Sequence, residues 1–439
     1  DLFVDHFCGG TDRFFDRIVQ FCEIKRIHRI FYGMADAFAN IHPIVLTHMN
    51  SFFHCFHFTI PESWLGMIVI IFMRWDYNND MKFYDILQMD PAQIRAMIAK
   101  TENAKEKRKL RAGMYARSFL IVVFAVLFIG IFTALFGSGN SAMAVSIFCI
   151  LLAVRFVDYG YRIQDALVNM FIVFAILTFV PSLALPLPWP ARWLIYFASL
   201  LVMLIMTAEK PHMGNGGLYT FAFIFLAGNP VHGQVLMQRA QMAFLGFLIC
   251  ACVYWHNHRS KDKKITFANV LKRFDLYTYK TQWQLRLALG ISVLLCIFTV
   301  FHLERYMWAG FAAGSLLSDA DVESNIHEKF SNRLLGVILG SALFYMIYLI
   351  VPARYYFLIG PVGGMCLGLC SKYTYKTVLN CFGALALAAS MYGIGNAVLL
   401  RIFDTLAGIF GALLFFYLYD RFILHKFLPN RSYVSKKEK

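Results

Sequence analysis

The feature that most constrains this chain is a long apolar segment that occurs twice at a fixed spacing. Residues 401–421 begin with an arginine, carry a glycine seven positions later, and run apolar to a closing pair of charges. Residues 239–255 show the same pattern 162 positions earlier, and the Pro-Ala-Arg sequences at 190–192 and 352–354 have the same offset. Two separate sequence matches at the same spacing predict a chain built from two repeats.

Composition places the chain among membrane proteins. Of its 439 residues, 59% are hydrophobic and 15% are charged, which lies outside the usual range of soluble proteins. The apolar residues form two sets of six runs. The first set is 118–136, 141–157, 166–185, 193–208, 217–228 and 235–255, and the second is 284–302, 305–318, 333–351, 354–370, 376–392 and 397–419. We therefore predict an all-α polytopic membrane protein made of two parallel repeats of about six transmembrane helices each. Several runs are shorter than the roughly 20 residues of a standard span, so we expect tilted or shielded helices.

Positive charge lies between the apolar runs. The formal net charge is +15, and basic residues gather before, between and after the two sets. Cytoplasmic loops carry such an excess of Lys and Arg, so the three basic segments share one side only if each half crosses the membrane an even number of times. Six spans per half, with both termini of the 81–439 region in the cytoplasm, satisfy this condition. We expect a multi-pass protein of the plasma or inner membrane, whose partner is the lipid bilayer and not nucleic acid.

The domain boundaries follow from these segments. Residues 118–255 are the first membrane repeat, 256–283 a basic cytoplasmic linker, 284–421 the second repeat and 422–439 a basic cytoplasmic tail. Residues 81–117 form a cytoplasmic amphipathic and basic helix, with Asp90 as its cap and Pro91 in the first helical position. Residues 1–80 show no clean period. They are either a re-entrant or interfacial region or an extension upstream of a natural start at Met81, and the amphipathic sequence after Met81 favours the second.

The sequence offers no residue set for catalysis or for a metal. Seven of the ten cysteines lie in apolar runs, where cysteine behaves as a small hydrophobic residue. His54, Cys55 and His57 are close together but lack a fourth ligand at a useful spacing. No nucleophile, base and orienting residue can be assembled from the ends of the runs. We therefore expect neither an enzyme nor a protein with a cofactor or metal.

Four charged residues lie inside or near the ends of apolar runs: Arg239, Arg333, Arg401 and Asp404. A charge at the centre of a membrane helix costs roughly 2.5–3.5 kcal/mol, so it usually serves a function. Arg401 and Asp404 are three apart and can pair on one helical face. In one interpretation the arginines snorkel to the interface and hold helix ends in place. In the other, the repeat-related Arg239 and Arg401 face a common axis and form a positive pathway for organic anions, with Arg333 at its cytoplasmic end.

Glycines spaced four apart indicate close helix packing, because small residues let membrane helices approach one another. They are Gly310 and Gly314, Gly336 and Gly340, and the run Gly360, Gly364 and Gly368, with Gly408 in the last apolar segment. The first half holds fewer such pairs. We expect tighter packing in the second half than in the first.

Three motifs in the second half carry a family likeness: YMWAG at 306–310, the arginine-glycine helix start at 333–340, and RIFDTLAG at 401–408. They resemble the FUSC family of fusaric acid resistance and aromatic acid exporter-like membrane proteins. The likeness is good over about 284–421 and moderate over 115–255. Plant aluminium-activated malate transporters are similar at a greater distance, with one six-span unit per chain. That similarity implies that the two halves pair within one chain about a pseudo-two-fold axis along the membrane normal.

The resemblance implies export of aromatic or other organic anions through a pathway between the two repeats. In it Arg239 and Arg401 supply positive charge and Asp404 orients Arg401. Two alternatives stay open at this point: a non-transporting membrane scaffold for cell-envelope proteins that docks partners on its basic segments, and a passive anion channel. A homo-oligomer is compatible with each of the three.

Overall fold

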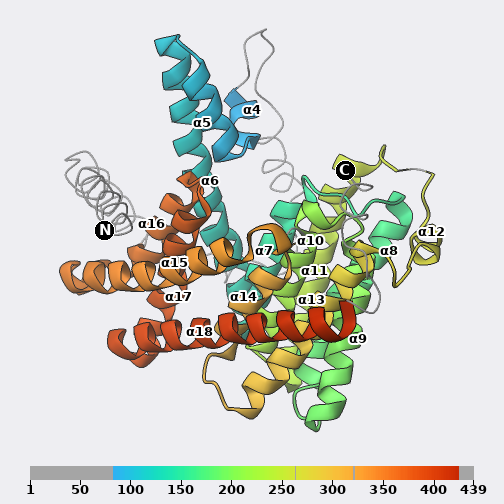
Figure 1. Ribbon diagram of the computed structural model, residues 1–439. Helices are drawn as coiled ribbons and strands as arrows, with labels where there is room; N and C mark the ends of the chain where they lie inside the picture. The colour runs from blue at the N-terminus through green and yellow to red at the C-terminus, as the bar shows by residue number, and fades with distance from the viewer. Residues whose placement is uncertain (1–82, 263, 320–321, 425–439) are drawn as a thin grey trace, which may run out of the picture. The chain divides into compact units, whose positions relative to one another are not determined.

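The computed structural model describes residues 83–262, 264–319 and 322–424, in which every regular element is a helix (Figure 1). The all-α prediction is therefore confirmed for this part of the chain. The predictions for residues 1–80, including His54, Cys55 and His57, and for most of the tail lie outside the described residues.

The helices form two sets of six. Two short helices, α4 (Phe83–Gln88) and α5 (Pro91–Lys100), precede the sets, and α12 (Phe267–Lys272) separates them. The first set is α6 (Ala104–Phe136), α7 (Ser141–Val154), α8 (Ile163–Leu183), α9 (Trp189–Thr207), α10 (Asn215–Ala227) and α11 (Gly233–His258). The second set is α13 (Tyr279–Val300), α14 (Tyr306–Leu317), α15 (Val322–Ile350), α16 (Tyr356–Leu369), α17 (Tyr373–Tyr392) and α18 (Ile394–Tyr419). Each predicted apolar run overlaps one helix of these sets.

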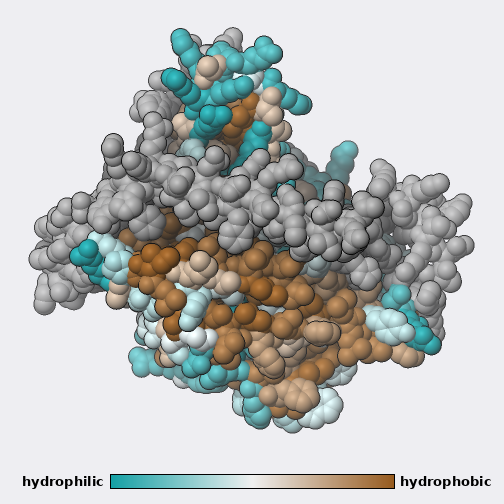
Figure 2. Space-filling view, turned by 60° about the vertical axis from the view of Figure 1, so that its left-hand side comes forward, coloured by the Kyte–Doolittle hydropathy of each residue, from teal (hydrophilic) through white to brown (hydrophobic). Residues whose placement is uncertain are grey.

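Seven of these helices are long and apolar enough to cross a membrane. They are α6, α8, α9, α11, α13, the Phe330–Ile350 part of α15, and α18 with its continuation to Ile423. Helices α7 and α10 are apolar but have only 14 and 13 residues, or about 20 Å against a hydrocarbon core of about 30 Å. On the face drawn in Figure 2, hydrophobic side chains cover a broad band with hydrophilic ones at its margins. These features define a multi-pass helical membrane protein.

Helix α6 joins two segments that the sequence analysis kept apart. It runs unbroken for 33 residues, from the basic segment through the apolar run, so the predicted boundary at residue 117 lies inside it. At about 50 Å it exceeds the thickness of the hydrocarbon core, and its basic start extends beyond the apolar span. Asn103 caps its first turn by accepting a hydrogen bond from the N–H of Lys105. Asp90 caps α5 as predicted, with Pro91 in the first helical position.

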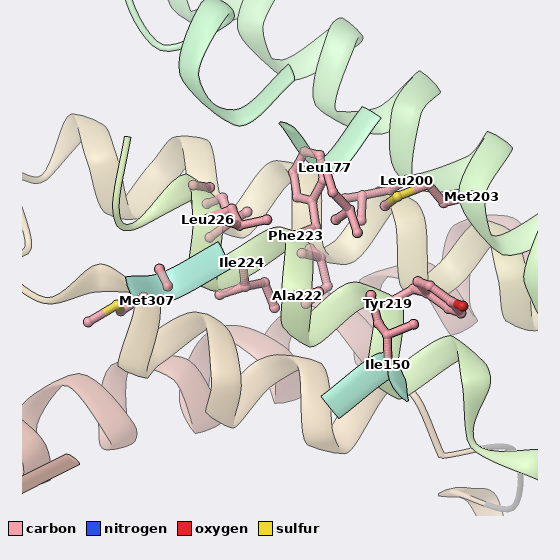
Figure 3. Close-up of a cluster of buried hydrophobic side chains, with 14 of the residues drawn as sticks. Ile150, Leu177, Leu200, Met203, Tyr219, Ala222, Phe223, Ile224, Leu226 and Met307 are labelled. Carbon is pink, nitrogen blue, oxygen red and sulfur yellow. The ribbon is translucent and has the colours of Figure 1, made fainter. Parts of the chain in front are cut away.

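The core of the first half is centred on α10. This helix packs against α7, α8 and α9 and against α14 of the second set, and nine of its 13 residues are buried. Figure 3 draws its Phe223 among Leu177 and Leu200 of the neighbouring helices. In the second half, α16 buries only three of its 14 residues. In the same half α13 buries 14 of its 22 residues and α14 nine of its 12. Burial therefore varies from helix to helix within each half, and the expectation of tighter packing in the second half stays a prediction.

Several of the predicted packing glycines lie where helices approach closely. A Cβ at Gly408 of α18 would collide with the carbonyl oxygen of Ala309 in α14. A Cβ at Gly340 of α15 would lie 2.5 Å from the carbonyl oxygen of Val378 in α17. Gly310 and Gly314 lie against Ile224, Gly336 against Thr377, and Gly368 against Ser118, whereas Gly360 and Gly364 have their nearest neighbours at 3.8 and 3.6 Å.

Some contacts occur in pairs whose members are related by the 162-residue spacing, both between and within the halves. Helix α6 of the first half packs against α16 of the second, and α9 of the first packs against α13 of the second. In sequence order, α6 corresponds to α13 and α9 to α16. Within the halves, Gly246 lies against Ile147 as Gly408 lies against Ala309. The members of these two pairs are related by the same 162 positions.

Candidate anion-binding site

The candidate site is centred on Arg401, the eighth residue of α18. Gly393, with φ 77°, separates α17 from α18 and allows the chain to turn between them. The Arg401 guanidinium carbon lies 5.0 Å from the centre of the Trp308 ring of α14. The Cys381 side chain of α17 is within hydrogen-bonding range of Arg401, and Arg333 of α15 is close enough to repel it electrostatically. Four helices of the second half therefore converge on one guanidinium group.

The charged groups at this point are buried. Arg401 is 4% exposed, Arg333 8% and Asp404 1%. The Nε atoms of both arginines and Oδ2 of Asp404 have no hydrogen-bond partner. Arg401 and Asp404 are three residues apart, yet the ion pairs of the described residues do not include one between them. We call Arg333, Arg401 and Asp404, with Trp308 and Cys381, the arginine cluster.

Arg239, which lies 162 positions before Arg401, has a different environment. It is fully buried, and Nε donates to Asn140 Oδ1 at 3.1 Å. Its Nη2 donates to the carbonyl oxygens of Gly139 at 3.3 Å and Asn229 at 2.9 Å. These acceptors belong to the turn before α7 and the turn after α10, so Arg239 ties two turns together. The structure thus brings three of the four predicted charges together and holds Arg239 in a separate set of contacts.

Sequence reasoning missed the aromatic and sulfur groups around the charges. Arg305 lies over the same Trp308 ring at 5.9 Å and over Tyr392 at 5.1 Å, so two guanidinium groups share one indole. Cationic groups are attracted to the faces of aromatic rings. Trp308 belongs to the YMWAG motif at 306–310, which carries the family likeness but did not assign the tryptophan to a site, because a tryptophan in a membrane helix is usually explained by packing. Cys381 was likewise assigned to packing.

A second polar group lies at the end of the bundle from which the linker leaves. Lys210 donates to Asp158 at 2.9 Å, and Lys261 lies 3.8 Å from the same carboxylate. Burial raises the pKa of Asp158, but the hydrogen bond and charge of Lys210, with the charge of Lys261, outweigh it. The pKa of Asp158 therefore lies below its ordinary value. The pKa of Lys210 lies above its own for the same reason.

Fold and site together define a class of protein: a multi-pass, all-helical membrane protein with an excess of positive charge buried between its helices. Residues 291–415 match the family model of fusaric acid resistance protein-like proteins, and this part of the chain belongs to that family. Membership indicates a role in membrane transport or efflux. The matched segment contains the whole arginine cluster, whereas Arg239 lies outside it. No curated protein and no solved structure matches the chain.

Proposed function

We propose that this protein exports organic anions, aromatic carboxylates among them, from the cytoplasm. The observation that carries the proposal is the pair of buried arginines, Arg333 and Arg401, neither of which has a carboxylate ion-pair partner among the described residues. Buried charges are expensive unless they are paired or bind something. In a membrane transporter such charges commonly mark the path of the transported ion.

The family name supports the anionic substrate class. It refers to resistance to fusaric acid, an aromatic carboxylic acid. A guanidinium group binds a carboxylate with two parallel hydrogen bonds. In the arginine cluster the guanidinium of Arg401 also lies against the indole of Trp308, so charge and aromatic surface occur together. The same chemistry fits an organic anion with a ring better than an inorganic ion.

We further propose that the two halves are structural repeats related by an axis along the membrane normal, and that the anion moves between them. Support comes from the α6–α16 and α9–α13 contacts. If each helix is replaced by the helix at the same place in the other half, one contact becomes the other. The Gly246–Ile147 and Gly408–Ala309 contacts add a residue-level correspondence. The basic segments before, between and after the halves favour cytoplasmic termini for residues 81–439. Whether the membrane is a plasma or an inner membrane stays a prediction.

Efflux from proteoliposomes tests the proposal. The purified full chain is reconstituted, loaded with a panel of aromatic and aliphatic carboxylates, and compared with Arg401→Gln and Arg333→Gln variants. We expect efflux by the wild type and its loss in both variants, while Arg354→Gln, a change at an exposed arginine, leaves it intact. Efflux that survives Arg401→Gln would contradict the assignment. Conductance that runs only down the gradient would identify a passive channel, and a folded protein that moves no anion would favour the scaffold.

A further inference from the structure

We propose that the arginine cluster is itself the substrate site on the pathway between the halves, that all its residues belong to the second half, and that it selects anions carrying a single negative charge. This inference rests on the proposed function and names the substrate class of the same site. The observations that carry it are the burial of Arg333, Arg401 and Asp404, the contact of the Arg401 guanidinium with the Trp308 ring, and the buried atoms of all three charged residues that have no hydrogen-bond partner. Arg401 also interacts electrostatically with Arg333 and Asp404.

The first step is a charge count. Two arginines and one aspartate leave the buried cluster with a net charge of one positive unit. Asp404 also interacts electrostatically with Glu304 and Arg305, whose opposite charges cancel and leave the sum unchanged. In a low-dielectric interior an unbalanced charge is unfavourable, and an anion with one charge neutralises it. An anion with two charges leaves one negative unit buried in its place.

The second step is the distribution of hydrogen-bonding capacity. The Nε atoms of Arg333 and Arg401 are buried and unpartnered, as is Oδ2 of Asp404. Each arginine atom can donate a hydrogen bond to a carboxylate. The Asp404 carboxylate repels a second one, because like charges in a buried site destabilise each other. Asp404 is therefore expected to act as a selectivity residue against dicarboxylates, by repulsion rather than by attraction.

The third step is the contrast with the first half. The guanidinium of Arg239 makes three hydrogen bonds to groups of its own half through Nε and Nη2, while its Nη1 is buried and unpartnered. At the position that corresponds to Asp404 the first half has Met242, which is fully buried. The first half therefore has an unpartnered donor but lacks the second arginine of the cluster and the acidic selectivity residue. Only the second half combines unpartnered donors from two arginines with an acidic residue.

A pair of probes that differ by one carboxylate tests the site directly. Benzoate and isophthalate share a ring, and at pH 8 they carry one and two negative charges. Their affinities are measured by calorimetry on the purified full chain in detergent. We expect the wild type to bind benzoate at least about tenfold more tightly than isophthalate, a difference of about 1.4 kcal/mol. Equal affinity for the two probes, or tighter binding of isophthalate, would overturn the inference.

Charge variants supply the decisive comparison. Asp404→Asn raises the net charge of the cluster to two positive units and is expected to abolish or invert the preference for benzoate. Arg401→Lys keeps the charge but loses the bidentate geometry. It should therefore weaken the binding of both probes while keeping the ratio of their affinities. The control Arg354→Gln should leave both affinities unchanged. A benzoate preference that is unaltered in folded Asp404→Asn protein would refute the charge selection.

The same probes in proteoliposomes separate this inference from the proposed function. Binding with the expected preference but no efflux would contradict export and support the site. Efflux of both anions at equal rates, unchanged by Asp404→Asn, would contradict the site and support export. Neither binding nor efflux of either probe would overturn both.

Discussion

At the scale of single residues, Arg239 and Arg401, which lie 162 positions apart, are the seventh residue of α11 and the eighth of α18 and have different partners. Nε and Nη2 of Arg239 donate to two turns of its own half, whereas Arg401 faces an indole, a thiol and a second arginine. A hydrogen bond to a charged group contributes about 1.5–3 kcal/mol, and its loss leaves buried acceptors unpaired. We therefore expect Arg239→Gln to lower the free energy of unfolding by about 2–4 kcal/mol, measured by denaturant titration in detergent. Destabilisation no larger than that of Arg354→Gln would contradict the tying role of Arg239.

The sequence located these charges but did not reveal their surroundings. Hydrophobic periodicity places Arg239, Arg333 and Arg401 on membrane helices because each interrupts an apolar run. The partners that distinguish them come from elsewhere: Asn140 lies 99 positions from Arg239, and Trp308 lies in a different helix from Arg401. A periodic pattern describes one helix at a time, so it carries no information on which helices meet. The 162-residue spacing predicted similar surroundings for Arg239 and Arg401, whereas the structure gives them different ones.

The ion pair of Asp158 gives a pH-dependent prediction. An unfolded aspartate has a pKa of about 3.9, and the pKa of folded Asp158 is lower. The pair therefore stabilises the protein above pH of about 4, and this contribution disappears as the pH falls through the lowered pKa. Because Lys210 and Lys261 are about half exposed, we expect on the order of 1 kcal/mol at most. The difference in melting temperature between wild type and Asp158→Asn should shrink from pH 6 to pH 3.

At the scale of elements, the close approach of α14 and α18 depends on one glycine. A Cβ at Gly408 would collide with the backbone oxygen of Ala309, which cannot move aside as a side chain can. We expect Gly408→Ala to destabilise the fold by about 1–3 kcal/mol and to weaken anion binding, because it separates Trp308 from Arg401. Gly395→Ala in the same helix meets no atom within 4 Å. It should be neutral or stabilising by up to about 1 kcal/mol, as alanine is the better helix former. Equal unfolding free energies for the two variants would contradict the role of Gly408.

Element positions were largely predictable and element boundaries were less so. The twelve apolar runs overlap twelve helices because an apolar stretch in a membrane has little alternative to a helix. The continuation of α6 through residue 117 was missed because its lysines and arginines are good helix formers and give no stop signal. Glycine spacing indicates where backbones can approach, but burial also depends on how many neighbours a helix has. Helix α10 is largely buried because it packs against α7, α8, α9, α13 and α14.

At the scale of the whole molecule, α13 is the helix through which the second half contacts the first at the linker end. Its Gln284 donates to the carbonyl oxygens of Leu204 and Ala208 at the end of α9. Its Trp283 ring lies against Gly216 at the start of α10. Lys280 pairs with Glu209 at 2.8 Å. These contacts lie on consecutive turns and join the halves at the end opposite Arg305. The halves also meet at the opposite end, where Asn229 donates to Met307 Sδ at 3.4 Å and Tyr306 donates to the carbonyl oxygen of Ala227. Both ends of the interface between the halves are therefore closed in this structure.

The Lys280–Glu209 pair allows the strength of the contact between the halves at the linker end to be measured. Both side chains are largely buried, at 18% and 15% exposure, so reversing one charge places two like charges in contact. We expect Lys280→Glu and Glu209→Lys each to lower stability and to increase leak of the transported anion, and the double exchange to restore both. A double-mutant cycle should give a coupling free energy of about 1 kcal/mol or more, with Lys272→Glu, an exposed change on the linker, as the control. If the halves separate here during each transport cycle, the single variants should also shift the ratio of efflux to leak. Additive effects in the cycle would show that the pair does not join the halves, and closure would then depend on Gln284 and Trp283 alone.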